Sequence, residues 1–433
     1  MTTDQLYQLY LQYPVISTDT RKIIPGSLFF ALKGDKFDAN TFAQQALEAG
    51  AAYAVVDNAQ YALTDKCILV DDVLTALQNL AAHHRSQLHI PFIGLTGSNG
   101  KTTTKELIKA VLSQHYKTYA TTGNLNNHIG VPLTILGIDN TIEMAVIEMG
   151  ANHQKEIELL CSIAQPNYGL ITNVGKAHLE GFGGAEGVKK GKGELYDYLK
   201  ANNGILFINT DSDDLIQMQL QRGLDGYNYG TRPNINFIRG ELVNTAPYIS
   251  LKWTRNETDV YEAGTQLTGV YNLHNILAAI CIGCYFKLSP EEIYAGISGY
   301  RPQNNRSQIA KTATNTLICD YYNANPSSMF VAIENIDKLP AEHKVAILGD
   351  MFELGEESAA EHLGVVAKAM QAGIDERIFI GDEFYKQNGL VDATFYRTVA
   401  EAQAGLKNKP IKNSTILIKG SRGMALERLV ELF

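Results

Sequence analysis

The stretch GLTGSNGKTTTKEL, residues 94–107, decides how this chain is organised. It is similar to the phosphate-loop pattern G-x-x-x-x-G-K-[ST], but Leu95 stands where the first glycine is expected. Gly97 can supply the bend instead, because glycine adopts backbone conformations that other residues avoid. In such a loop Lys101 reaches the phosphates and the Thr102 hydroxyl binds Mg²⁺. The alternative is an ordinary strand, turn and helix with an exposed lysine.

The flanking residues favour the phosphate loop. The apolar run HIPFIGLTG (89–97) predicts a buried strand, and the apolar residues at 107, 108, 111 and 112 recur at helical spacing. A strand before the loop and a helix after it are the context that this motif requires. We therefore predict a nucleotide site, and the loop residues expected around the phosphates are Gly97, Ser98, Asn99, Gly100, Lys101, Thr102 and Thr103.

Apolar runs that predict buried strands alternate with helical patterns along the whole chain. They lie at 27–32, 53–57, 144–150, 168–175, 204–211, 344–350, 377–382 and 415–421. This alternation indicates an α/β protein with largely parallel sheets covered by helices. We expect three domains: a small mixed α/β domain (1–88), a central P-loop-type domain with helices on both faces of its sheet (89–299), and a Rossmann-like α/β domain (300–433). The polar stretch GYRPQNNR (299–306) suits a linker between the last two.

The bulk composition narrows the class of protein. The chain has 433 residues, a net charge of −9 and five cysteines without framework spacing. The negative charge argues against non-specific nucleic-acid binding. No apolar run approaches the ~18 residues that cross a bilayer, and no basic-then-apolar leader is present at the start. We therefore expect a cytoplasmic protein with free thiols and no membrane insertion, and nothing demands more than a monomer.

Two further positions fit nucleotide chemistry. Glu148 ends the apolar run 145–147, and a carboxylate at the end of a neighbouring strand can hold Mg²⁺; a surface glutamate is the alternative. Arg306 lies in the predicted linker, from which an arginine could reach the γ-phosphate when the domains close. A plain hinge-region arginine is equally consistent with the residues alone. Asn272 and Asn275 lie three apart on one helix face, which suits an adenine edge or a helix cap.

The chain resembles the Mur ligases, which are ATP-dependent peptide ligases of bacterial cell-wall synthesis. The loop TGSNGKTTTKE is similar to their variant phosphate loop, in which the first glycine is not used. The other matching segments are STDTRKIIPGSLFFALKG (17–34), GNLNNHIGVPLTIL (123–136), VIEMGANHQKEIELL (146–160), ITNVGKAHLEGFGG (171–184), GKGEL (191–195), GVYNLHNILAA (269–279), DYYNANPSSM (320–329), LGDMFELGEES (348–358) and KGSRGMALE (419–427). The resemblance therefore covers nearly the whole chain.

The resemblance implies an ADP-forming ligase that joins D-alanyl-D-alanine to UDP-N-acetylmuramoyl-tripeptide, with ATP and two Mg²⁺ ions as cofactors. Lys101, Glu148, His178, Lys192 and Arg306 would be the catalytic residues. Thr102 and Glu148 would hold the first Mg²⁺, and His178 with a carbamylated Lys192 would serve the second. Nucleotide contacts would come from Asn272, Asn275, Asp320 and Asn323.

The resemblance also implies substrate contacts in all three domains. Uridine and diphosphate would be bound by Ser17, Asp19, Arg21 and Phe29. The muramoyl-peptide would be bound by Thr122, Asn124 and Asn126. The dipeptide carboxylate or the acyl phosphate would be bound by Lys419, Ser421 and Arg422.

The sequence departs from the family pattern at two places. Asp38-Ala39-Asn40 stands where the family has D-G-H, and Cys319 occupies an otherwise acidic position, so the acidic role falls to Asp320 alone. Two other functions stay open: another amide ligase with this loop, such as folylpolyglutamate synthetase, and a P-loop ATPase that turns over ATP without an amine acceptor.

Overall fold

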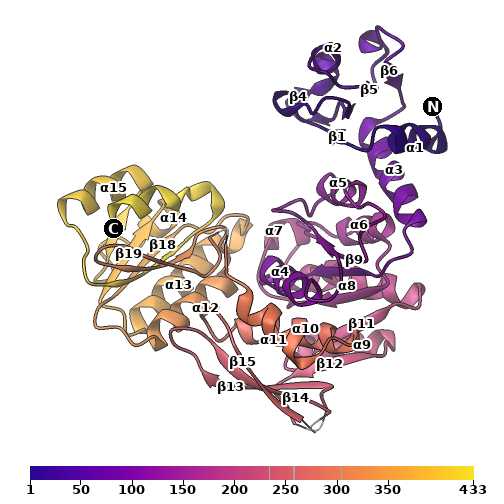
Figure 1. Ribbon diagram of the computed structural model, residues 1–433. Helices are drawn as coiled ribbons and strands as arrows, with labels where there is room; N and C mark the ends of the chain where they lie inside the picture. The colour runs from indigo at the N-terminus through magenta and orange to yellow at the C-terminus, as the bar shows by residue number, and fades with distance from the viewer. Residues whose placement is uncertain (234, 257–258, 304) are drawn as a thin grey trace.

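The computed structural model describes residues 1–233, 235–256, 259–303 and 305–433. The chain forms three main sheets, each covered by its own helices, and the N-terminal domain stands apart at one end of the molecule (Figure 1). The expected three-domain α/β architecture is confirmed. The sheets use strands within 16–69, 92–264 and 308–419, so each lies inside one predicted domain range. The domain boundaries themselves stay predictions. Asn304, in the predicted linker, lies outside the described residues.

The N-terminal sheet is wholly parallel, in the order β1-β2-β5-β6. Its strands are β1 (Ile16–Ser17), β2 (Leu28–Phe30), β5 (Tyr53–Val56) and β6 (Cys67–Leu69), with α1 (Thr3–Gln12), α2 (Ala43–Glu48) and α3 (Val73–Gln87) around them. A small hairpin, β3 (Lys33–Gly34) and β4 (Phe37–Asp38), follows β2. The helix α3 fastens this domain to the central one, because Arg85 Nε donates to Ala164 O at 2.9 Å and His84 Nε2 donates to Ile138 O at 2.8 Å.

The central sheet has nine strands in the order β15-β14-β13-β12-β11-β10-β7-β9-β8. The strands from β8 to β13 run parallel, as predicted: β7 (Phe92–Thr96), β8 (Thr118–Ala120), β9 (Met144–Glu148), β10 (Tyr168–Ile171), β11 (Ile205–Asn209), β12 (Gly226–Gly230) and β13 (Ile238–Asn244). An antiparallel extension, β14 (Ser250–Arg255) and β15 (Asp259–Gly264), was not predicted. β14 alternates buried residues with more exposed ones, and β15 has a single buried residue, so both lack the apolar runs used to find the other strands.

Helices cover both faces of the central sheet. They are α4 (Lys101–Leu112), α5 (Gly130–Leu136), α6 (Glu156–Ala164), α7 (Leu179–Phe182), α8 (Ala185–Ala201), α9 (Asp213–Arg222), α10 (Asn272–Tyr285) and α11 (Pro290–Gly299). The apolar run 276–286 lies mostly in α10, whose Cys281 and Cys284 are buried free thiols. None of the helices in the described part of the chain is long and apolar enough to cross a membrane.

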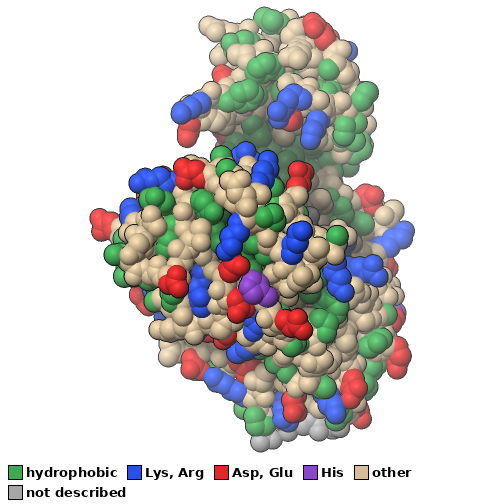
Figure 2. All heavy atoms as spheres, turned by 90° about the vertical axis from the view of Figure 1, so that its left-hand side faces the viewer, with side chains coloured by type: hydrophobic (Ala, Val, Ile, Leu, Met, Phe, Trp, Pro, Cys, Tyr) green, Lys and Arg blue, Asp and Glu red, His purple; other side chains and the backbone are tan. Residues whose placement is uncertain are grey.

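The C-terminal sheet is parallel except for β16, in the order β16-β17-β21-β18-β19-β20. Its strands are β16 (Gln308–Lys311), β17 (Thr316–Asp320), β18 (Lys344–Gly349), β19 (Glu376–Ile380), β20 (Thr394–Tyr396) and β21 (Thr415–Lys419), and its helices are α12 (Pro326–Lys338), α13 (Ser358–Gln371), α14 (Asp382–Tyr385) and α15 (Val399–Asn408). Figure 2 shows a face on which acidic and basic side chains are interspersed, without a field of one sign.

The strand ends place the functional loops. The phosphate loop follows β7, Glu148 ends β9, and the segment 172–178 follows β10. Asp320 ends β17 and Lys419 ends β21, in the C-terminal sheet. Ligands of open α/β sheets bind at the carboxyl ends of strands. These ends meet between the central and C-terminal domains.

Candidate active site

A cavity of about 940 Å³ lies between the central and C-terminal domains. It brings together most of the residues that the sequence singled out from these two domains. Those that line it are Ser98, Asn99, Gly100, Lys101, Thr103, Asn124, Asn126, Glu148, His178, Asn272, Asn275, Arg306, Asp320, Asn323 and Lys419. A three-domain chain thus forms one shared site from segments more than three hundred residues apart.

The phosphate loop bends at Gly97, as the sequence indicated. Gly97 has φ +147°, and a Cβ there would lie 1.9 Å from Thr172 Oγ1, so only glycine fits. Gly100 has φ +78° and directly precedes α4. Leu95 is fully buried inside β7. The position at which the usual pattern has its first glycine, 95, is therefore part of strand β7 in this chain and not part of the loop.

Lys101 is folded over its own loop. Its Nζ donates to Gly97 O at 2.6 Å and to Ser98 O at 3.2 Å. Burial, opposed by the nearby Glu148 and assisted by Arg306, lowers the pKa of Lys101 to about 8. A polyphosphate would offer the ammonium group stronger, charged acceptors than these two carbonyls.

The affinity for ATP is expected to fall as pH rises from about 7 to about 9, by up to tenfold per unit above the pKa of Lys101. The sign follows because the bound polyanion raises the pKa of Lys101, so the complex takes up a proton that the free protein has lost. Calorimetric titration with MgATP measures this. In Lys101→Arg the guanidinium stays charged and the slope should vanish. Equal wild-type affinity at both pH values would contradict the pKa of Lys101.

Glu148 presents an unsatisfied carboxylate oxygen. Its Oε1 accepts hydrogen bonds from Thr102 Oγ1 at 3.2 Å and Asn126 Nδ2 at 2.8 Å. Its Oε2 is buried and has no hydrogen-bond partner among the described residues; Lys105 Nζ is 3.9 Å away. A buried anionic oxygen without a donor is costly, and a hard divalent cation satisfies it. The pair Thr102 and Glu148 therefore fits the Mg²⁺ site expected there.

Lys192 lies beside the cavity and does not line it. The side chain, on α8, is 1% exposed, with Nζ 3.2 Å from Ala151 O and 4.8 Å from the centre of the Phe182 ring. Burial lowers the pKa of Lys192 well below its usual value, with Lys101 adding to the effect. A neutral amine is the form that reacts with CO₂, and a carbamate would extend the side chain while making it anionic. The burial of Lys192 fits the suspected modification.

His178 contacts the C-terminal domain. It lines the cavity, and its Nδ1 is bonded to Glu353 Oε2. Within the described residues, no three His, Cys, Asp or Glu side chains converge to hold an ion by themselves. Any Mg²⁺ here would share its coordination sphere with phosphate oxygens, which is how this ion is commonly bound.

Asn272 and Asn275, which are expected on the adenine side, form a short buried network. Asn275 Nδ2 donates to Asn272 Oδ1 at 2.8 Å, so the two amides project together as expected. Asn272 Nδ2 donates to Thr268 O, and Thr104 Oγ1 donates to Asn275 Oδ1. An amide carries two N–H donors, and the bonds of this network use one from each asparagine. His274, which sequence reasoning missed, also lines the cavity, and Asp211 Oδ2 lies 2.8 Å from its Nε2.

Arg306 projects into the cavity from the interdomain segment. Its guanidinium lies 3.8 Å from the centre of the Tyr322 ring, and its buried Nε has no hydrogen-bond partner among the described residues. Asn305 (φ +56°) and Ser307 (φ +51°) flank it in left-handed conformations that non-glycine residues rarely adopt. Ser307 N donates to Asp320 Oδ1 at 3.1 Å. Tyr322 and Ser307 were missed, because their roles depend on this tertiary contact.

The C-terminal substrate candidates are placed differently from one another. Lys419 Nζ pairs with Asp320 Oδ2 at 2.7 Å and donates to Asn323 O at 3.2 Å, at the wall of the cavity. Ser421 does not line the cavity: it is 2% exposed, and its Oγ accepts from Phe352 N at 2.9 Å. Arg422 is exposed, 5.7 Å from the centre of the Tyr322 ring. Ser421 thus holds a loop, and a direct contact with the dipeptide finds no support here.

The muramoyl-peptide candidates meet the cavity in part. Asn124 and Asn126 line the cavity, and the Asn126 amide donates a hydrogen bond to Glu148. Thr122 is exposed but does not line it. Cys319, the departure before Asp320, is buried in the C-terminal core and removes no group from the cavity.

The N-terminal candidates lie outside this cavity. Ser17 Oγ donates to Ser27 Oγ at 2.9 Å, and Asp19 pairs with Arg21 at 2.7 Å. Phe29 is fully buried in a core cluster, so its side chain has no surface for a ligand in this structure. The departure at Asn40 has a structural role, because this buried amide donates to Asp38 Oδ1 at 2.7 Å and Asp57 Oδ1 at 2.8 Å.

Comparison with known proteins gives a consistent result. Three family models match: "Mur ligase family, catalytic domain" over residues 12–85, "Mur ligase middle domain" over 95–283, and "Mur ligase, glutamate ligase domain" over 305–422. UDP-N-acetylmuramoyl-tripeptide–D-alanyl-D-alanine ligase of Bacillus subtilis is 35% identical over 96% of this chain and 92% of its own length. Its Escherichia coli counterpart is 36% identical with the same coverage.

Solved structures agree. A crystal structure of MurF from Acinetobacter baumannii superposes with a TM-score of 0.88 at 29% identity, covering 99% of this chain and 98% of that one. MurF from Thermotoga maritima in complex with ADP gives 0.87 at 25% identity, covering 98% and 97%. Folylpolyglutamate synthase of Mycobacterium tuberculosis, at 14% identity, a TM-score of 0.63 and coverage of 83% and 94%, shares the fold alone.

Proposed function

We propose, because the chain belongs to the Mur ligase family, that its cavity carries out the family's ATP-dependent peptide-bond formation. The enzyme joins D-alanyl-D-alanine to UDP-N-acetylmuramoyl-tripeptide, a step of peptidoglycan precursor and cell-wall synthesis. The observation that carries this function is the shared cavity, in which Lys101 of the phosphate loop and Arg306 of the interdomain segment both line the wall.

The reaction has two steps, formation of an acyl phosphate and attack of an amine on it. The tripeptide's terminal carboxylate attacks the γ-phosphorus of ATP, which gives an acyl phosphate and ADP. The amine of D-alanyl-D-alanine then attacks the acyl carbon, and phosphate leaves. Bringing a carboxylate onto a polyphosphate requires dense positive charge and rigid positioning more than proton transfer. Lys101 and Arg306 supply cationic groups from two domains.

The metal ions are part of the proposal. Thr102 and Glu148 would hold the first Mg²⁺, and the orphaned Oε2 of Glu148 supports this placement. His178 and the carbamate of Lys192 would serve the second. When bound, Mg²⁺ neutralises charge on the phosphate oxygens. The chain's own side chains orient the phosphates and the acceptor carboxylate around these positions.

The substrates would span the molecule. The nucleotide would lie along the phosphate loop towards Asn272 and Asn275, with Asp320 and Asn323 on the C-terminal side. The muramoyl-peptide would follow Asn124 and Asn126, and the dipeptide would enter near Lys419 and Arg422. Uridine and diphosphate would be bound near Ser17, Asp19 and Arg21. We propose a monomeric enzyme of the cytoplasm.

Phosphate release tests the function directly. With MgATP, UDP-N-acetylmuramoyl-tripeptide and D-alanyl-D-alanine together, we expect release together with a product heavier than the tripeptide substrate by the dipeptide less one water. Omitting the dipeptide should remove the product. Comparable release from ATP and Mg²⁺ alone, without a ligated product, would instead identify a free-standing ATPase.

A further inference from the structure

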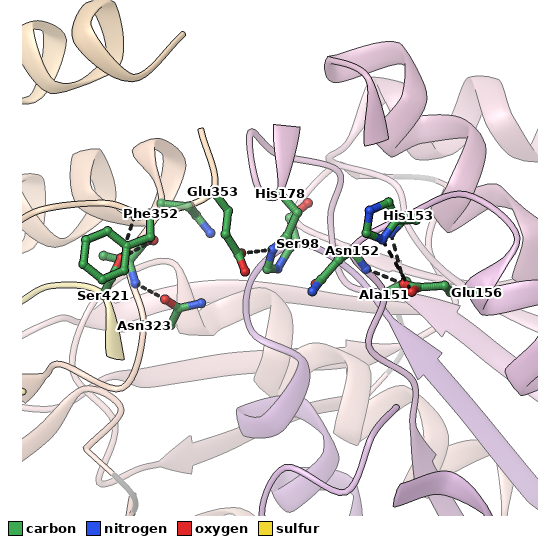
Figure 3. Close-up of polar contacts among 12 residues, drawn as sticks. Ser98, Ala151, Asn152, His153, Glu156, His178, Asn323, Phe352, Glu353 and Ser421 are labelled. Carbon is green, nitrogen blue, oxygen red and sulfur yellow. Dashed lines mark hydrogen bonds and ion pairs between the residues drawn. The ribbon is translucent and has the colours of Figure 1, made fainter. Parts of the chain in front are cut away.

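A hydrogen bond between His178 and Glu353 joins the central and C-terminal domains beside the cavity. His178, after β10, is bonded through Nδ1 to the carboxylate of Glu353, which follows β18 in the C-terminal domain. Figure 3 shows the Glu353 side chain reaching across the gap between the two ribbons to the imidazole. Glu353 lies in the matching segment 348–358, but the sequence alone predicts no role for it.

The loop that carries Glu353 is anchored at successive residues. Met351 N donates to His362 Nε2 at 3.0 Å, and Phe352 N donates to Ser421 Oγ at 2.9 Å. Glu353 itself has φ +62°, a left-handed conformation that is costly for a non-glycine residue. Backbone strain of this kind persists where the surroundings impose it, and it is concentrated at functional sites. The loop therefore holds the carboxylate in one place.

The partner segment is equally fixed. His178 has φ +53°. Two residues before it, Lys176 Nζ pairs with Glu361 at 2.5 Å, and Lys176 N donates to Ser327 Oγ at 3.0 Å. A Cβ at Gly175 would lie only 2.9 Å from the same Ser327 Oγ, so the two backbones approach closely. The contact between His178 and Glu353 is thus one part of a tight docking of the C-terminal domain.

The hydrogen bond to Glu353 determines which ring nitrogen of His178 carries the proton. A carboxylate oxygen of Glu353 meets Nδ1 of the His178 ring as hydrogen-bond and ion-pair partner. A carboxylate can only accept, so the proton of this bond is on Nδ1. In the neutral ring the other nitrogen, Nε2, then keeps its lone pair, in a side chain that lines the cavity. Carboxylates that accept the second ring N–H of a metal-binding histidine fix its tautomer and orientation.

We propose that Glu353 is a positioning residue that fixes His178 with Nε2 free for a cation, so that this ligand is ready only when the C-terminal domain is docked. The inference rests on the proposed function, in which His178 serves the second Mg²⁺. In this role Glu353 makes the C-terminal domain contribute to the metal site. The orientation of His178 that phosphoryl transfer needs then depends on docking of that domain.

Nitrogen-15 NMR of the metal-free, full-length protein tests the tautomer. At about pH 9, well above the ordinary histidine pKa of ~6.5, we expect the wild-type His178 proton on Nδ1. In Glu353→Ala the proton should move in part to Nε2. The assay of ligation should show kcat lower by about 10–100-fold, with the Mg²⁺ requirement raised and KM for ATP near the wild-type value.

Two further variants separate positioning from general damage. Glu353→Gln keeps an oxygen that accepts from Nδ1–H and should retain more activity than Glu353→Ala. Glu356→Ala removes an exposed carboxylate three residues further along the chain, in the short 3-10 helix Gly355–Glu357, and should behave as wild type. A wild-type proton on Nε2, or an unchanged tautomer and kcat in Glu353→Ala, would overturn the proposal. Absence of ligation by the wild type would count against the proposed function, while the tautomer would still report on Glu353.

Discussion

Arg306→Ala is expected to lower kcat by about 10³–10⁵-fold, the range measured for arginines that stabilise phosphoryl transfer. The guanidinium lies in the cavity, stacked on Tyr322 at 3.8 Å and near enough to Lys101 to lower its pKa. Its buried Nε lacks a partner among the described residues, so a hydrogen-bonding group is left free for a ligand. Because Lys101 and the loop amides remain, MgATP should still bind. Single-turnover formation of ADP with the tripeptide substrate measures the loss.

Two control variants distinguish a role of Arg306 in catalysis from a role as an ordinary residue of the interdomain hinge. Arg306→Lys keeps the charge but loses the planar, forked guanidinium that can stack on Tyr322 while donating, so it should restore only part of the rate. Arg301→Ala removes an exposed arginine from the same polar stretch and should leave kcat unchanged. If Arg306→Ala and Arg301→Ala lose equal, small amounts of activity, Arg306 belongs to the hinge and contributes no charge to the reaction.

Lys192→Ala is expected to lower kcat by about 10²–10³-fold, the size of effect seen when one electrostatic group of an active site is removed. The reason is chemical: burial lowers the pKa of the Lys192 amine and so favours the neutral form that reacts with CO₂, and a carbamate on it would supply the anion that a second Mg²⁺ needs. Bicarbonate or acetate should restore part of the activity of Lys192→Ala, because either can occupy the space of the missing carbamate.

The modification has a readout that does not depend on catalysis. Wild-type protein equilibrated with ¹³C-bicarbonate should show one carbamate carbon resonance that is absent from Lys192→Ala. Lys190→Ala, which removes an exposed lysine of the same helix, should keep both the resonance and full activity. A Lys192→Ala variant that neither bicarbonate nor acetate restores, together with no carbamate signal in the wild type, would contradict carbamylation.

The local pattern of the sequence was sufficient for several structural features. The pair Asn325-Pro326 is a typical N-cap followed by a first-turn proline, and Asn325 Oδ1 accepts from Ser328 N at the start of α12. That cap also reaches the phosphate loop, where Asn325 Nδ2 donates to Asn99 Oδ1 at 2.8 Å. Capping depends on residues three apart, and buried parallel strands have continuous apolar runs, so both can be found from short segments.

By itself, then, the sequence determined the parallel α/β architecture, the variant phosphate loop with its bend at Gly97 and, through the matching segments, the family. Only the tertiary structure decided which side chains from distant parts of the chain meet. Glu353 contacts His178, Tyr322 stacks on Arg306, and Ser421 holds a loop away from the cavity. These contacts join positions 16 to 175 residues apart in the chain, and no periodicity or spacing encodes them. They arise from the packing of loops at the strand ends and, for His178 and Glu353, from the docking of the C-terminal domain on the central one, and neither is a property of local sequence.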